Sequence, residues 1–249
     1  MTRSMLSHES KKLVVGMAGD GGNDCGGLRA AHAGMALSDA EASMVSPFSS
    51  GRDGKSLMTV VDMIREGRAC LSTNLATFRF FMVYGFVLTF VRTFLLLLGS
   101  LSMGEFVWLT NDIVFGIVMV SLMCRSKPTD ALCSYRPTAT LFGLRTLSAI
   151  AFPVVSSVVF MAISYAVLWQ QSWYVFVNAL TDLSIPGYLW MLKGDNYDSS
   201  IGVVFLLAVL STTAFVNTYG GDFRQNIRRN YGISVAYAVT MAGVYIMIL

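Results

Sequence analysis

Charged residues are scarce in this chain, because they make up only 13% of its 249 residues while 54% are hydrophobic. A mean hydropathy of +0.59 excludes an ordinary soluble domain. The first twelve residues carry charges and no apolar core, so we expect no cleavable signal peptide. The composition therefore predicts an integral membrane protein, inserted by internal apolar segments.

Cysteine is also sparse, and its spacing excludes two common kinds of site. The four cysteines form no CxxC pair and have no zinc-ligand spacing, so we expect free thiols on the cytosolic side: Cys25, Cys70, Cys124 and Cys133. The chain has no Asn-x-Ser/Thr sequon, so glycosylation gives no information on sidedness. The formal net charge is only +3, and we expect the bilayer rather than nucleic acid as a partner.

Five apolar segments are each long enough to cross a bilayer as a helix, and they lie at about 80–98, 106–124, 147–169, 201–218 and 231–249. The connections 125–146 and 219–230 are rich in Arg and Lys, whereas 99–105 and 170–200 are not. Since basic connections face the cytosol, this alternation predicts a cytosolic amino terminus.

Residues 173–192 are apolar enough to count as a sixth span, but two features argue against one. Asp182 and Pro186 would lie near its middle, and its insertion would place Arg224, Arg228 and Arg229 outside. We instead expect an aromatic belt at the non-cytosolic interface, formed by Trp169, Trp173, Tyr174, Tyr188 and Trp190.

The residues before the first span divide into two parts. Residues 1–54 are polar and too few to bury a sheet alone, so we interpret them as the remnant of a larger α/β domain. Residues 55–79 have apolar residues at helical spacing and no breaker before the span, which predicts a stalk helix.

The remnant contains the most specific stretch of the chain. The apolar run Leu13–Ala18 predicts a strand buried on both faces, and residues 19–24, GDGGND, form the loop that leaves its carboxyl end. Carboxylates at Asp20 and Asp24 are hard oxygen ligands suited to Mg²⁺ beside a phosphate. Ordinary turn chemistry is the alternative. Further on we expect a helix at 25–32, a strand at 33–37 and a helix started by a capping box at 38–41.

The longer string GDGGNDCGGLRAAHAGMALSDAEASMVSPF resembles the hinge segment of the P-type ATPases. Its AHAG, SDAEAS and SPF elements resemble the type-V branch, whose members export polyamines. The stretch Ile64–Ala69 and the pair Arg136–Pro137 agree, so the resemblance covers nearly the whole chain. It implies a multi-span α-helical membrane protein preceded by a partial α/β, haloacid-dehalogenase-like phosphorylation domain.

The resemblance also implies roles for individual residues and cofactors. Asp20 would bind Mg²⁺, Asn23 and Asp24 would steady that site, and Gly19 and Gly21 would support the phosphate, with ATP bound mainly by domains outside this chain. The phosphorylated aspartate of the family lies in a DKTGT loop, and no aspartate here is followed by KTGT. The five spans resemble the family's fifth to ninth. We therefore expect a carboxyl-terminal fragment that is inactive without the amino-terminal part of the pump.

Two charged residues lie well inside the predicted spans, Arg92 and Asp112. Both are six residues from the short connection 99–105, so an antiparallel hairpin would place them at one depth and favour an ion pair. Snorkelling of both to the interface is the alternative. The resemblance implies that Asp112 lines the cation pathway, where we also place Asn111, Arg92 and Tyr84, whose ring would attract an ammonium group.

Two functions remain open from sequence. The chain is either part of an ATP-driven cation exporter, for polyamines by resemblance, or a catalytically dead membrane protein that binds or regulates a full-length pump. Reading the genomic sequence upstream of Met1 for a DKTGT loop separates them. The resemblance implies a late endosomal, lysosomal or vacuolar membrane.

Overall fold

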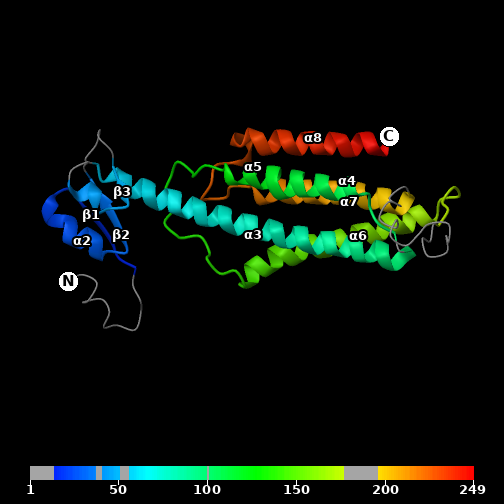
Figure 1. Cartoon of the computed structure of the whole chain (residues 1–249), viewed down its shortest axis with the longest axis horizontal. Helices are drawn as coiled ribbons and strands as arrows, with labels where there is room; N and C mark the ends of the chain where they lie inside the picture. The colour runs from blue at the N-terminus through cyan, green and yellow to red at the C-terminus, as the bar shows by residue number, and fades with distance from the viewer. Residues whose placement is uncertain (1–13, 38–40, 51–55, 100, 177–195) are drawn as a thin grey trace. The chain divides into compact units, whose positions relative to one another are not determined.

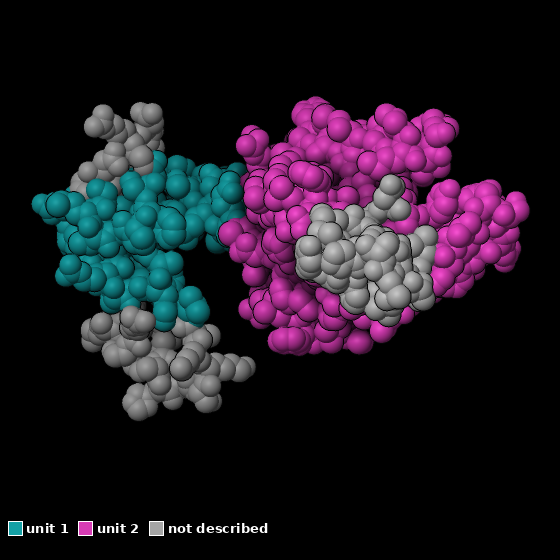
Figure 2. Space-filling view, turned by 45° about the vertical axis from the view of Figure 1, so that its right-hand side comes forward, with its two compact units in different colours: residues 1–67 teal, residues 68–249 magenta. Residues whose placement is uncertain are grey.

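The computed structural model describes residues 14–37, 41–50, 56–99, 101–176 and 196–249. Residues 38–40 of the predicted capping box and most of the rejected span at 173–192 therefore lie outside the described residues. The chain divides into two compact units, residues 1–67 and residues 68–249, which Figure 2 colours separately.

Unit 1 is built on a small parallel sheet in the order β1-β2-β3 (Figure 1). Strand β1 (Gly16–Gly19) pairs with β2 (Ala33–Ala36) from Gly16 opposite Ala33 to Gly19 opposite Ala36, and β2 pairs with β3 (Phe48–Ser49). The connection from β1 to β2 contains the short 3-10 helix η1 (Gly22–Asp24) and helix α2 (Cys25–Ala30). Because both ends of β1 are fixed by this pairing, the loop after Gly19 has a defined position at the sheet's carboxyl edge.

The core of unit 1 is small, with Leu28, Ala36 and Ala42 buried. The first strand was predicted to be buried on both faces, and this is wrong for the chain as it stands, because Val14 is 82% exposed and the side chains of β1 are only partly covered. The helix predicted after the capping box is wrong too, since residues Glu41–Met44 form a single 3-10 turn, η2. Pro47 follows closely and disfavours helical geometry in the residue before it.

Within the described residues, five helical segments are long and apolar enough to cross a membrane, and each overlaps one predicted segment. They are α3 (Met58–Gly99), the run of α4 (Glu105–Asn111), η3 (Asp112–Met119) and α5 (Val120–Cys124), then α6 (Leu144–Trp169), α7 (Tyr197–Asn217) and α8 (Tyr231–Ile248). Segment η3 is π-helical and α3 has no break. These segments run side by side in Figure 1.

The core of unit 2 follows from an apolar stripe on α3. Five residues spaced three or four apart are buried: Phe80, Val83, Val87, Val91 and Leu95. Helix α7 packs against α6, η3, α5 and α8. At Gly202 a Cβ atom would lie 2.6 Å from Met103 Cε, so the end of the Met103 side chain packs directly on the α7 backbone. Helix α7 thus contacts η3, the segment that begins with Asp112.

Candidate functional sites

The GDGGND loop is held by one carboxylate. Asp24 Oδ2 accepts hydrogen bonds from the backbone N–H of Asp20 at 3.1 Å and of Gly21 at 3.2 Å. The N–H of Asp24 donates to the carbonyl oxygen of Gly21 at 3.1 Å, which closes the turn. Asp24 therefore shapes the loop, and Asp20 is presented directly after the last residue of β1.

Glycine is required where the Asp24 side chain folds back over the loop. A Cβ atom on Gly19 would lie 2.7 Å from Cβ and Oδ2 of Asp24, which is closer than real Cβ contacts. A Cβ atom on Gly21 would lie 2.5 Å from Oδ1 of Asn23, at the end of a side chain that can turn away. The predicted supporting residues Gly19, Gly21 and Asn23 thus lie together around Asp24, and the glycines let side chains approach the backbone.

The residues present fit part of a Mg²⁺ site. Among the described residues no group of three His, Cys, Asp or Glu side chains could hold a metal. Mg²⁺ is commonly bound by one or two protein carboxylates while water and phosphate oxygens supply the other ligands. The loop lies at the carboxyl edge of a parallel sheet and presents Asp20, so it supplies one such carboxylate.

In the membrane unit, Tyr84 and Asp112 come together. The phenol Oη of Tyr84 on α3 donates a hydrogen bond of 2.7 Å to Oδ1 of Asp112, the first residue of η3. The predicted Arg92–Asp112 ion pair is wrong. The Arg92 guanidinium instead lies over the Trp108 ring, 5.4 Å from its centroid, in a cation–π contact.

The connection between α3 and α4 explains why the predicted pairing fails. The N–H of Leu101 donates to the carbonyl oxygen of Leu95 at 3.1 Å, so the chain folds back along α3 before α4 begins. The indole N–H of Trp108 donates to the carbonyl oxygen of Met103 at 3.2 Å and fixes the start of α4. Asp112 consequently meets a residue of α3 farther from the connection than Arg92.

Asn111 is the least satisfied polar residue of this region. It is 1% exposed, and neither its Oδ1 nor its Nδ2 has a hydrogen-bond partner among the described residues. An unpaired buried amide costs about 1–3 kcal/mol, and π-helical stretches such as the adjoining η3 are frequent at functional sites. Oδ1 of Asn111 is therefore a ready acceptor for a ligand N–H group.

Comparisons with known proteins show which family contains a chain with the GDGGND loop and the polar residues around Asp112. No protein-family profile matches the chain. The chain is 36% identical over 246 residues to "Polyamine-transporting ATPase 13A3" of Macaca fascicularis, in an alignment that includes 92% of the chain. It is 32% identical over 241 residues to "Polyamine-transporting ATPase 13A2" of Homo sapiens, in an alignment that includes 95% of the chain. It is also 30% identical over 239 residues to the "Vacuolar cation-transporting ATPase YPK9" of Saccharomyces cerevisiae.

The chain belongs to the P-type ATPases of the type-V branch. It spans only about a fifth of the length of these curated relatives, 20% of the macaque protein, 19% of the human one and 15% of the yeast one.

One buried carboxylate of this type-V ATPase stretch was not predicted from the sequence. Asp198, in the first turn of α7, is 1% exposed, and its carboxylate accepts a hydrogen bond of 3.1 Å from Tyr174 Oη. Tyr165 Oη donates to the Asp198 carbonyl oxygen at 2.7 Å. Burial, and then the negative charge of Asp198, raises the pKa of Tyr174 to about 12. In the sequence Asp198 was one acid of a polar connection, and no periodic signal marked it as buried.

Proposed function

We propose that this stretch is part of an ATP-driven cation exporter and contributes the Mg²⁺ loop and half of the cation pathway. The observation that carries the proposal is the polar group inside the membrane unit: Tyr84 bonded to Asp112, beside an Asn111 amide that is buried and unpaired among the described residues. Polar groups in membrane helices are costly and mark ion or substrate pathways.

The chemistry of this group favours a polyamine. Asp112 supplies a negative charge, Asn111 an amide oxygen, and Tyr84 an aromatic face, which together suit an alkylammonium group. Arg92 is held over Trp108 and so does not neutralise Asp112. Two of the relatives are named as polyamine-transporting ATPases, and this supports the same substrate class here.

Asp112 and Arg92 are exposed on the outside of the described bundle. A charge facing hydrocarbon is costly, so this face needs a covering partner. We take that partner to be the amino-terminal part of the same pump, whose membrane helices would complete the pathway.

In the cytosolic unit, Asp20 would be the Mg²⁺ ligand, while Asp24 positions it by holding the loop backbone. Gly19 and Gly21 keep the backbone open to a phosphate, and Asn23 adds hydrogen-bonding capacity beside it. When bound, Mg²⁺ neutralises charge on the phosphate. We assign this unit to a haloacid-dehalogenase-like phosphorylation domain, supported by its parallel sheet order and the family membership.

The sequence contains no DKTGT loop, so the 249-residue chain alone is proposed to form no aspartyl phosphate and to pump nothing. The name of the yeast relative supports a vacuolar membrane, with the late endosomal or lysosomal membrane as its equivalent elsewhere. Radiolabelled ATP followed by acid quench tests the first point, and a hydroxylamine-labile phosphoprotein from the purified chain would refute it.

The transport role is tested in a complete pump that carries this stretch. Asp112→Asn should reduce polyamine-stimulated ATP hydrolysis at least about tenfold, the equivalent of about 1.4 kcal/mol, because the attracting charge is lost. Arg92→Ala should change it much less. Unchanged polyamine dependence in the Asp112→Asn pump removes the site and favours the alternative of a regulator that binds another pump.

A further inference from the structure

Unit 2 contains a groove of about 1630 Å³ that is separate from the Tyr84–Asp112 pair. Residues of α3, α6, α7 and α8 line it, and most of its wall is apolar. Phe152 and Phe160 in this wall are 77% and 66% exposed, so the groove is open at the outer surface of the bundle. Its cytosolic end is different, because Arg79 from α3 and Arg224 from the α7–α8 connection line it there.

Arg224 is 4% exposed, and only part of its guanidinium is satisfied. Nη2 donates to the carbonyl oxygens of Asn217 at 2.9 Å and Tyr219 at 3.0 Å, which caps the carboxyl end of α7. Nε and Nη1 are buried and have no hydrogen-bond partner among the described residues. The cap therefore accounts for one nitrogen of Arg224 and leaves its other two nitrogens without an acceptor among the described residues.

The backbone around Arg224 is fixed by the neighbouring cytosolic connection. Arg224 forms an isolated β-bridge with Pro128, and the N–H of Gln225 donates to the carbonyl oxygen of Lys127 at 2.8 Å. The nearby acid in the chain, Asp222, accepts a hydrogen bond from Tyr135 Oη. Asp222 also lines the groove, but its carboxylate is not a hydrogen-bond partner of Nε or Nη1 of Arg224.

Arg79 adds a second cation to the same end of the groove. Its Nε is likewise buried without a hydrogen-bond partner in the described part of the chain. Burial, and then the positive charge of Arg79, lowers the pKa of the Arg224 guanidinium, so the two side chains repel each other. Since arginine stays charged even so, the two guanidinium groups retain buried N–H donors that no described residue fills, and these donors suit an anion.

We propose that the Arg79–Arg224 end of this groove binds the phosphate of an anionic phospholipid whose acyl chain lies along the apolar wall. Guanidinium groups bind phosphate through paired N–H donors, and an anionic headgroup meets them on the cytosolic leaflet. The apolar wall that continues from this end toward Trp173 favours a lipid over a free phosphate ion. This inference does not depend on the transport proposal.

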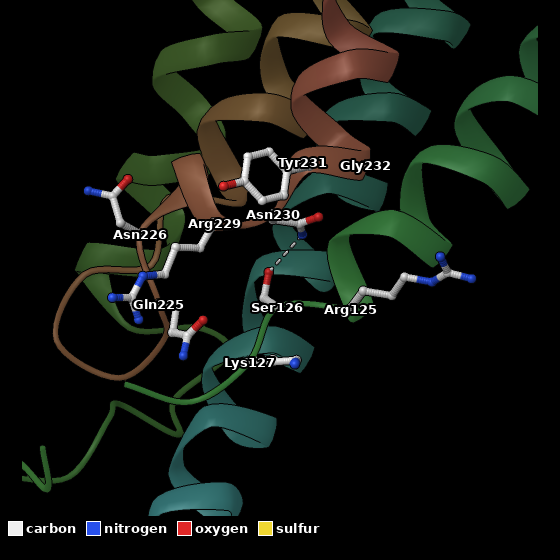
Figure 3. Close-up of a pocket in the computed structure, with 9 residues that line it drawn as sticks. All are labelled: Arg125, Ser126, Lys127, Gln225, Asn226, Arg229, Asn230, Tyr231 and Gly232. Atoms are coloured by element: carbon white, nitrogen blue, oxygen red, sulfur yellow. Dashed lines mark hydrogen bonds between the residues drawn. The ribbon is translucent and has the colours of Figure 1, made fainter. Parts of the chain in front are cut away.

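A second basic pocket on this face provides the control. It measures about 550 Å³ and is lined by Arg125, Lys127 and Arg229 among others (Figure 3). These three cations are exposed, and in the close-up Arg229 extends away from Arg125 and Lys127. Arg229 pairs with Asp130 at 3.3 Å. Water can solvate Lys127, so its loss should not affect a lipid held at Arg79 and Arg224.

The test uses the purified 249-residue chain in phosphatidylcholine vesicles with and without phosphatidic acid, with native mass spectrometry after detergent extraction to count retained lipid. Arg79→Gln, which leaves the α7 cap intact, should lower phosphatidic acid retention about fivefold, the equivalent of about 1 kcal/mol for one interfacial cation, and Arg224→Gln at least as much. Lys127→Gln should retain lipid like the wild type.

Equal retention by Arg79→Gln and the wild type would overturn the proposal. Displacement of phosphatidic acid by inorganic phosphate alone would also overturn it, because the site would then bind a soluble anion. Neither readout uses ATP hydrolysis or cation transport, so failure here is distinguishable from failure of the transport role.

Discussion

The two candidate sites differ in the groups that hold a carboxylate in position. In unit 1 Asp24 is held by backbone N–H groups of Asp20 and Gly21, at most four residues away in the chain. In the membrane unit Asp112 is held by the side chain of Tyr84, 28 residues away on another helix. The loop depends on local backbone geometry, whereas the membrane pair depends on the register between two helices.

The two sites also differ in how many of their polar atoms have hydrogen-bond partners. The loop uses its own amides, so it reaches its geometry without a ligand. The membrane group leaves both polar atoms of Asn111 without a partner among the described residues, beside Asp112. Unsatisfied capacity of this kind suits a site that must bind a substrate and later release it, because the protein does not fill the site itself.

The largest effect is expected when the local carboxylate is removed. Asp24→Ala in a complete pump should lower Mg²⁺-dependent phosphoenzyme formation about a hundredfold. Two charge-assisted hydrogen bonds worth at least about 1.5 kcal/mol each are lost, together about 3 kcal/mol. Asp24→Asn keeps an accepting oxygen and should lose much less. A Mg²⁺ dependence of Asp24→Ala equal to that of the wild type would show that the loop is not held in this way.

A smaller effect is expected from overpacking the loop. Gly19→Ala places a methyl group against the Asp24 side chain and should destabilise the loop by about 1–3 kcal/mol, measured as faster hydrogen exchange at the Asp20 and Gly21 amides of the purified chain. A Cβ atom on Gly26 would have no neighbour within 4 Å, so Gly26→Ala is the matched control. Similar exchange in both variants would contradict the close contact at Gly19.

The smallest effect tests the register of the membrane pair. A double-mutant cycle of Tyr84→Phe and Asp112→Ala, followed by unfolding of the chain in detergent, should give a coupling energy of about 0.6–1.7 kcal/mol, the range for hydrogen bonds between membrane helices. The cycle of Arg92→Gln and Asp112→Asn should be additive, because Arg92 lies over Trp108 rather than beside Asp112. Coupling in the second cycle and none in the first would restore the pairing predicted from sequence.

The sequence predicts the loop better than the membrane pair for a physical reason. The backbone amides that hold Asp24 lie within the GDGGND string, so the residue types and their spacing carry the geometry. The apolar lengths likewise predict where the five membrane helices lie, to within a few residues for most ends. Strand β3, with only two residues, has too short a pattern to be recognised.

The intramembrane pairing could not be predicted by counting residues from the turn. That count assumes that both helices end at the same level, and the backbone bond from Leu101 to Leu95 shifts α4 along α3. The burial of Asp198 and Arg224 could not be predicted from the sequence either. Both belong to polar connections and become buried only through contacts with other segments.

The π-helical stretch η3 has a consequence for how this span tolerates change in length. A π-helical turn holds an extra residue, so removal of one residue between Asp112 and Met119 would let the chain relax into a regular α-helix with the side chains of α5 still facing the same neighbours. The same deletion within α7 would rotate everything beyond it by about 100° and turn its buried face outward. Length variation within this span should therefore be confined to η3.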